Sequence, residues 1–204
     1  MKKNEYIRKG SIAWYASRYW KPALVVGLSV AVLGSAIAFA GAKGEVEPKI
    51  QEPIETLPIS EFQAFTPLED VPLDAELQEF IFGVAEDYGL EGELVMAVIG
   101  QESNYKHCEI GDYGRSYGLM QIQKQFHEER MERLKVTDLL DPYENVIVGV
   151  DYLAECIEKG DLEYGLMAYN GGMAYANEMT AQGTVSEYAE SVLMLAELLK
   201  GGKQ

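Results

Sequence analysis

One glutamate in this chain stands where its carboxyl group could act as an acid. Glu102 continues an apolar stripe along one face of a predicted helix. The stripe consists of Leu94, Val95, Val98 and Ile99. A carboxyl group that faces an apolar interior or a cleft resists ionisation, so its pKa rises, as a general acid near neutral pH requires. The alternative is a helix-end glutamate that reaches solvent or caps a neighbouring turn.

The elements that would position this glutamate are mostly helices. Asp74 is a predicted N-cap of a helix that ends at Gly89, and a second helix covers about residues 93–102. Glycines and tyrosines in residues 104–123 predict turns around short β-strands. Further helices are predicted at residues 125–134, 142–159, 161–170 and 184–200. The predicted fold class is therefore mainly α.

The N-terminal part differs from the rest in charge and hydropathy. Residues 1–22 contain six Lys and Arg residues and one Glu, and residues 23–42 contain no charged residue. An apolar helix of about 20 residues can cross a bilayer, and the basic flank predicts a cytoplasmic N-terminus with the remainder exported. A signal peptide cleaved near Ala40 or Ala42 is the alternative. The protein is then expected at the cell membrane if the segment is retained, or secreted if it is cleaved.

The rest of the chain is acidic. Residues 43–72 hold five of the seven prolines and many acidic residues, which predicts an extended linker before a domain at residues 73–201. The formal net charge is −16, and residues 43–204 offer no cluster of Lys and Arg. Nucleic acid is therefore not expected as a partner.

Export affects the interpretation of the cysteines. Cys108 and Cys156 would lie where a disulfide can form, so either they pair, or Cys156 is a buried helix residue and Cys108 a separate loop thiol. His107 and His127 show no ligand-like spacing with each other or with the cysteines. We expect no metal and no cofactor.

Five ordered motifs resemble the lytic transglycosylase domain, the goose-lysozyme-like branch of the lysozyme superfamily. They lie at residues 85–105, 116–122, 141–153, 166–172 and 187–193, and include Gly-Leu-Met-Gln and Ala-Tyr-Asn-Gly-Gly. The resemblance runs from about Asp74 to Lys200. It implies a lysozyme-like α+β domain whose small β/turn segment lines a sugar cleft. It also implies cleavage of the β-1,4 bond between N-acetylmuramic acid and N-acetylglucosamine in peptidoglycan.

The resemblance assigns the chemistry to one residue. Glu102 matches the family's single acid/base, which protonates the glycosidic oxygen and then takes a proton from the 6-hydroxyl of the sugar, leaving a 1,6-anhydro product. Tyr169 matches a tyrosine whose hydroxyl points at that glutamate, and Asn170 matches the polar residue beside it. Ser103 would contact substrate or close its helix, and Tyr188 would lie beside the cleft or pack in the core.

The Gly-Leu-Met-Gln motif resembles the segment that lines the sugar cleft. There Gly118 allows close approach of the backbone, Met120 offers an adaptable apolar wall, and Gln121 offers a polar side chain for acetamido or hydroxyl groups. The alternative is a core strand with Leu119 buried.

Two other functions remain open on the sequence. A second carboxylate would favour plain hydrolysis, and Glu109 and Asp112 are candidates, although Asp112 before Tyr113-Gly114 also suits an ordinary turn. A non-catalytic module that binds peptidoglycan or serves as a scaffold for cell-envelope machinery is the third hypothesis. The chain departs from the family at residues 123–134, where many members have a proline and a threonine, so its sugar subsites are expected to differ.

Overall fold

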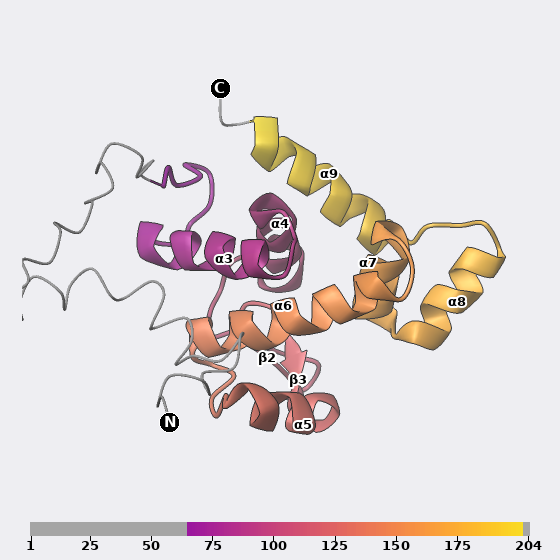
Figure 1. The fold of residues 1–204 in the computed structure, drawn as a ribbon, viewed down its shortest axis with the longest axis horizontal. Coiled ribbons are helices and arrows are strands. Elements are labelled where there is room, and N and C mark those ends of the chain that lie inside the picture. Colours follow the sequence, from indigo (N-terminus) through magenta and orange to yellow (C-terminus); the bar gives the residue numbers. More distant parts are fainter. Residues whose placement is uncertain (1–64, 202–204) are drawn as a thin grey trace, which may run out of the picture.

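The computed structural model describes residues 65–201, which form a helical domain with one small sheet (Figure 1). The helices are α3 (Ala75–Asp87), α4 (Gly92–Ser103), α5 (Lys124–Leu134), α6 (Pro142–Glu158), α7 (Leu162–Gly171), α8 (Met173–Ala181) and α9 (Glu187–Gly201). The strands are β1 (Ile110–Gly111), β2 (Ser116–Tyr117) and β3 (Ile122–Gln123), paired antiparallel in the order β1-β2-β3. The mainly α prediction with a short β segment is confirmed.

Several helix ends lie where local sequence signals predict them. The Asp74 carboxylate accepts a hydrogen bond of 2.8 Å from the backbone N–H of Leu77, at the first turn of α3. Gly89 follows the end of α3 with a φ of +71°, a left-handed conformation that glycine adopts without strain. Asp141 caps α6 in the same way, by accepting from the N–H of Glu144 at 2.9 Å.

Helix α6 holds the domain together, because it contacts α3, α5, α7 and β3. Figure 1 shows α9 packed across α4 on one side of α6, and α5 with the small sheet on the other side. Residues 94–99 of α4 are all buried, which explains the apolar run before Glu102. Helix α4 therefore brings Glu102 out of the core at its C-terminal turn.

A buried carboxylate fixes α5 against α6 and α3. Asp151 of α6 is 8% exposed and accepts hydrogen bonds from Arg130 and Arg133 of α5 and, at 2.8 Å, from the hydroxyl of Tyr88. Burial opposes ionisation of Asp151, but these hydrogen bonds and the charges of the two arginines hold its pKa below the ordinary value. This ion-pair network sets the position of α5 relative to the rest of the domain.

Two features of the fold differ from the predictions. Helix α8 was not predicted, because Gly171-Gly172 indicates the end of a helix and α8 buries only Ala176. Leu68 and Val71, inside the predicted linker, are buried in the core, where the side-chain amide of Gln78 bonds their backbone groups. The packed domain therefore starts before residue 73.

The remaining predictions concern the N-terminal part and the cysteines. The predicted membrane segment at residues 23–42 lies outside the described residues; within residues 65–201 no helix is long and apolar enough to span a membrane. Both cysteines are free, Cys108 on an exposed loop and Cys156 buried in α6. A disulfide between them is therefore not formed, because one thiol packs inside the domain while the other faces solvent.

Candidate functional site

A cleft of about 820 Å³ lies between the small sheet, α5, α6 and the C-terminal end of α7. Its lining includes Glu102, Asp112, Gln121, Phe126, His127, Arg130, Tyr152, Glu155, Tyr169 and Asn170. These residues come from five separate segments of the chain. The cleft therefore brings together the glutamate, the β segment and the Tyr-Asn pair that the sequence motifs indicated.

Glu102 is half-buried at the C-terminal turn of α4, with one carboxyl oxygen held by Tyr188 of α9. The Tyr188 hydroxyl donates to Oε1 of Glu102 at 2.6 Å. Burial raises the pKa of Glu102 to about 7; the hydrogen bond from Tyr188 opposes this rise and the charge of Asp112 adds to it. A large fraction of Glu102 is then protonated near neutral pH, as a general acid requires.

The hydroxyl that contacts Glu102 belongs to Tyr188 and not to Tyr169, so that part of the prediction is wrong. The Tyr169 hydroxyl donates to the backbone carbonyl of Met120 at 2.7 Å. Tyr169 still lies in the cleft, where burial and the nearby charge of Glu102 raise its pKa well above the ordinary value. Tyr169 therefore fixes the Gly-Leu-Met-Gln turn beside Glu102.

Met120 does not form an apolar wall of the cleft, as was predicted. Its side chain is fully buried and packs against Gly149 of α6, where a Cβ would lie 2.4 Å from Met120 Sδ. The tight contact leaves no room for a larger residue at 149. Met120 therefore joins the turn to the core, and only its carbonyl serves the site through Tyr169.

The close approach of backbone expected at Gly118 is present, but the neighbour is the protein itself. Gly118 has a φ of +74°, and a Cβ there would lie 2.4 Å from Nδ2 of Asn145. Asn145 is fully buried; its Oδ1 accepts from the N–H of Met120, and its Nδ2 donates to the carbonyls of Tyr117 and Leu139, each at 2.8 Å. Sequence reasoning missed this role of Asn145, although the residue lies in the motif at residues 141–153.

The other predicted substrate-binding residues divide between the cleft and the core. Ser103 is buried and donates to the carbonyl of Ile99 at 3.1 Å, so it closes its helix. Gln121 lines the cleft, with its amide donating to the carbonyl of Gly118 at 2.9 Å. Asn170 is exposed at the cleft, where its side chain is open to a ligand.

Of the two candidate second carboxylates, the structure brings Asp112 into the cleft and leaves Glu109 outside the cleft lining. Asp112 has a φ of +47° in the turn between β1 and β2 and accepts hydrogen bonds from Ser116 Oγ at 2.5 Å and Gln123 Nε2 at 3.0 Å. It is thus a turn residue, as one alternative expected. Its charge also acts on Glu102, because it raises the pKa of that carboxyl.

A family profile described as "Transglycosylase SLT domain" matches residues 79–191, more than half of the chain. The chain belongs to this family. The family prediction made from the motifs is confirmed. The SLT domain is the catalytic domain of lytic transglycosylases, which are enzymes that cleave glycosidic bonds.

The fold of this SLT domain is similar to that of a solved enzyme. The X-ray structure of an inactive mutant of the lytic transglycosylase Slt from Pseudomonas aeruginosa matches with a TM-score of 0.55 and 18% sequence identity. The match covers 64% of this chain and 24% of that chain. The likeness at this identity supports the fold, and the chain spans only about a quarter of the larger enzyme.

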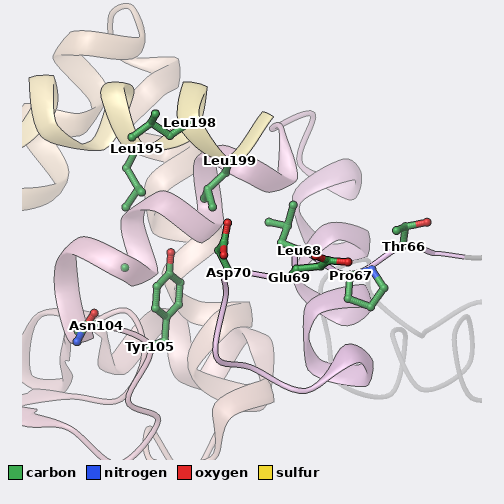
Figure 2. Close-up of a pocket in the computed structure, with 11 residues that line it drawn as sticks. Thr66, Pro67, Leu68, Glu69, Asp70, Asn104, Tyr105, Leu195, Leu198 and Leu199 are labelled. Atoms are coloured by element: carbon green, nitrogen blue, oxygen red, sulfur yellow. The ribbon is translucent and has the colours of Figure 1, made fainter. Parts of the chain in front are cut away.

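A second pocket in the SLT domain lies apart from the cleft. It measures about 660 Å³ and is lined by residues 66–70, the end of α4 and three leucines of α9. Figure 2 shows the side chains of Tyr105, Asp70 and Leu199 around it. Glu102 does not line this pocket, so the cleft is the candidate active site.

Proposed function

We propose that this SLT domain cleaves the β-1,4 bond between N-acetylmuramic acid and N-acetylglucosamine in peptidoglycan, with Glu102 as the single acid/base. The observation that carries the proposal is the half-buried carboxyl group of Glu102 in a cleft lined by polar and aromatic side chains, with Tyr188 donating to it at 2.6 Å. Burial raises the pKa of this carboxyl group to about 7. In the first step, protonated Glu102 donates to the glycosidic oxygen as that bond breaks. The muramic acetamido group stabilises the cation at the anomeric carbon, as in other substrate-assisted glycosidases.

The second step returns the proton. Ionised Glu102 takes the proton of the 6-hydroxyl, whose oxygen attacks the anomeric carbon of the same sugar and closes a 1,6-anhydro ring. The hydrogen bond from Tyr188 at 2.6 Å supports this step, because it stabilises the ionised carboxylate. The solved Slt structure, determined on an inactive glutamate-to-glutamine mutant, supports an essential glutamate in a protein of this fold.

We also propose that the enzyme acts at the outer face of the cell membrane. The support is the uncharged segment at residues 23–42 after a basic N-terminus, which would place the domain outside the cytoplasm. Tethering raises the local concentration of an acidic domain near an anionic wall. Cell-envelope machinery is the proposed type of partner, and secretion after cleavage near Ala40 or Ala42 is the alternative.

The decisive experiment is mass spectrometry of muropeptides that the purified full chain releases from peptidoglycan, with Glu102→Gln alongside. Anhydro products that disappear in the variant would support the transglycosylase mechanism. Reducing-end products, heavier by one water, would instead indicate a hydrolase. If the folded protein releases nothing, the non-catalytic binding or scaffold function is favoured.

The hydrogen bond between Tyr188 and Glu102 gives a prediction for the pH profile. Loss of this bond in Tyr188→Phe should raise the pKa of Glu102, because the bond lowers it. The alkaline limb of kcat/KM then moves to higher pH, since protonated Glu102 is the active acid, and kcat falls about tenfold. Tyr117→Phe is the control, because its hydroxyl donates to the Gly114 carbonyl outside the cleft. A limb that stays in place would contradict the role of Tyr188.

Hydrolysis is the second candidate function, and the position of Asp112 in the cleft favours it. A general base contributes about 10²- to 10⁴-fold, so Asp112→Asn should cost that much if Asp112 activates water. We expect instead that the variant keeps at least about a tenth of the activity and still forms anhydro products. Its alkaline limb should move to lower pH, because the charge of Asp112 raises the pKa of Glu102. Product mass and pH profile together decide between the two functions.

A further inference from the structure

The second pocket, of about 660 Å³, has an apolar wall that faces solvent. The wall is formed by Leu195, Leu198 and Leu199 of α9. Leu198 is 67% exposed, although its neighbour Leu199 is buried. Figure 2 shows the Tyr105 ring pointing toward these leucines. An apolar hollow at the surface is typical of a site that binds another molecule.

The apolar wall continues outside the pocket along α9. Met194 and Leu198 are one helical turn apart on the same face of the helix, and each is 67% exposed. The other face of α9 buries Val192, Ala196 and Leu199 in the domain. A surface helix normally has polar residues on the side away from the core. The exposed stripe of Met194 and Leu198 is therefore more apolar surface than the packing of α9 on its own domain requires.

The pocket also carries negative charge. Glu69 and Asp70 line it, and both side chains are exposed. Within residues 65–201 no Lys or Arg forms an ion pair with either carboxylate. Lys200, the basic residue of α9, already pairs with two other glutamates of the domain. The pocket thus presents unpaired carboxylates beside leucine side chains, a combination that complements a ligand with both positive charge and an apolar group.

The turn after Glu102 forms another wall of the pocket. Tyr105 has a φ of +64°, a left-handed conformation that is uncommon for a bulky residue. Gly100 makes room for its ring, because a Cβ there would lie 2.8 Å from Tyr105 Oη. Within the described part of the chain the Tyr105 hydroxyl makes no hydrogen bond, so it can bond to the backbone of a docked peptide. Strained backbone that places a side chain in this way is typical of functional sites.

We propose that this pocket and the exposed stripe of α9 form a docking surface for a basic segment of another cell-envelope protein. An apolar side chain of the segment lies among the α9 leucines, and flanking Lys or Arg residues pair with Glu69 and Asp70. The acidic residues 43–64 of the chain itself lack this complementary charge, and the proposed location puts the basic residues 1–22 across the membrane. Only the assignment of the partner to the cell envelope rests on the proposed function.

The docking surface leaves the active-site cleft open. Among residues 65–201, no residue lines both the pocket and the cleft. Tyr105 follows Glu102 closely in the chain, yet Glu102 lines only the cleft. A glycan strand and the partner can therefore be bound at the same time. Binding of the partner then raises the local concentration of the enzyme at one part of the wall.

The test of the charge is fluorescence anisotropy of a labelled synthetic peptide, titrated with the purified full chain. The peptide has leucines at helical spacing between flanking lysines. The double variant Glu69→Lys, Asp70→Lys should weaken its binding about tenfold or more, because two ion pairs are replaced by repulsion. The double variant Glu128→Lys, Glu129→Lys on the exposed surface of α5 changes the net charge equally and should alter the affinity less than about threefold.

The apolar contact is tested by a separate variant. Leu198→Ala should weaken binding of the peptide about fivefold to tenfold, as expected for partial loss of one buried leucine. The side chain is largely exposed in the free protein, so the fold should be unchanged. Leu162→Ala on α7, 38% exposed and outside the pocket and the cleft, is the matched control. Muropeptide release should stay within about twofold in all of these variants, because none of the replaced residues lines the cleft.

The outcomes separate this proposal from the proposed function. If the peptide does not bind, or binds every variant equally, while anhydro muropeptides are released, the docking surface is wrong and the function stands. If Leu198→Ala turns a dimer into a monomer in sedimentation, the surface binds a second copy instead. If the peptide binds only after Ile59→Ser and Phe62→Ser, the chain's own linker is the occupant, and the partner is again wrong. If the peptide behaves as expected but Glu102→Gln leaves muropeptide release unchanged, the proposed function fails and the docking surface stands.

Discussion

Glu102→Gln is expected to lower kcat on peptidoglycan by about 10³-fold or more. A single acid/base acts in both steps of the proposed reaction, and one such group typically contributes about 10²- to 10⁴-fold in each step that it catalyses. The glutamine keeps the size of the side chain and can accept from Tyr188, so the geometry survives while the proton is lost. The measurement is the rate of muropeptide release, followed by mass spectrometry.

The same substitution should stabilise the protein at alkaline pH. Folding raises the pKa of Glu102 from 4.5 to about 7. The folded state therefore loses stability as pH rises through this interval, and above it the full free-energy cost of ionising the buried carboxyl group is present. The neutral glutamine avoids a cost of about 1–3 kcal/mol at pH 8 and gains nothing at pH 4. Urea unfolding of the full chain at pH 4 and at pH 8 tests whether the glutamine stabilises the protein only at the higher pH.

The control for Glu102 is Glu109→Gln. Glu109 is a half-buried glutamate near the small sheet, outside the cleft lining, with an exposed ion pair of 3.8 Å to Lys106. Its replacement should leave the rate of muropeptide release near that of the unmodified protein. Equal losses of activity in the two variants would mean that Glu102 has no special chemical role.

Asn145→Leu is expected to cost about 3–6 kcal/mol of the free energy of unfolding. Leucine has nearly the same shape but leaves three buried backbone groups, on Met120, Tyr117 and Leu139, without their partner. Each unsatisfied buried group costs about 1–3 kcal/mol, and domains of this size are stable by only about 5–15 kcal/mol. Chemical denaturation measures the loss directly.

Asn170→Leu is the matched control for this second prediction. Asn170 is exposed at the end of α7, so the same substitution should change the free energy of unfolding by less than about 0.5 kcal/mol. If Asn145→Leu were as stable as Asn170→Leu, the hydrogen bonds of Asn145 would not hold the turn. Activity of Asn145→Leu should fall with stability, because the Tyr169 hydroxyl bonds to the carbonyl of Met120 within that turn.

The sequence by itself determined the local features of this protein. The caps at Asp74 and Asp141, the glycine after α3 and the apolar stripe before Glu102 depend on residues within a few positions of one another. Spacing and side-chain chemistry predict such features without knowledge of the rest of the chain. The order of the motifs was also sufficient to identify the family before any distance was known.

Contacts between distant segments were decided only by the tertiary structure. Tyr188 bonds Glu102 across 86 residues, and Tyr169 bonds Met120 across 49. Which of the two tyrosine hydroxyls contacts Glu102 depends on how α7 and α9 pack in the domain. The periodicity of residues within either helix does not encode this packing. The same applies to Met120, whose burial follows from close packing on Gly149, and to Phe126, which reaches the cleft because Asp151 fixes α5. Local sequence sets which side chains are present, while packing sets which of them meet.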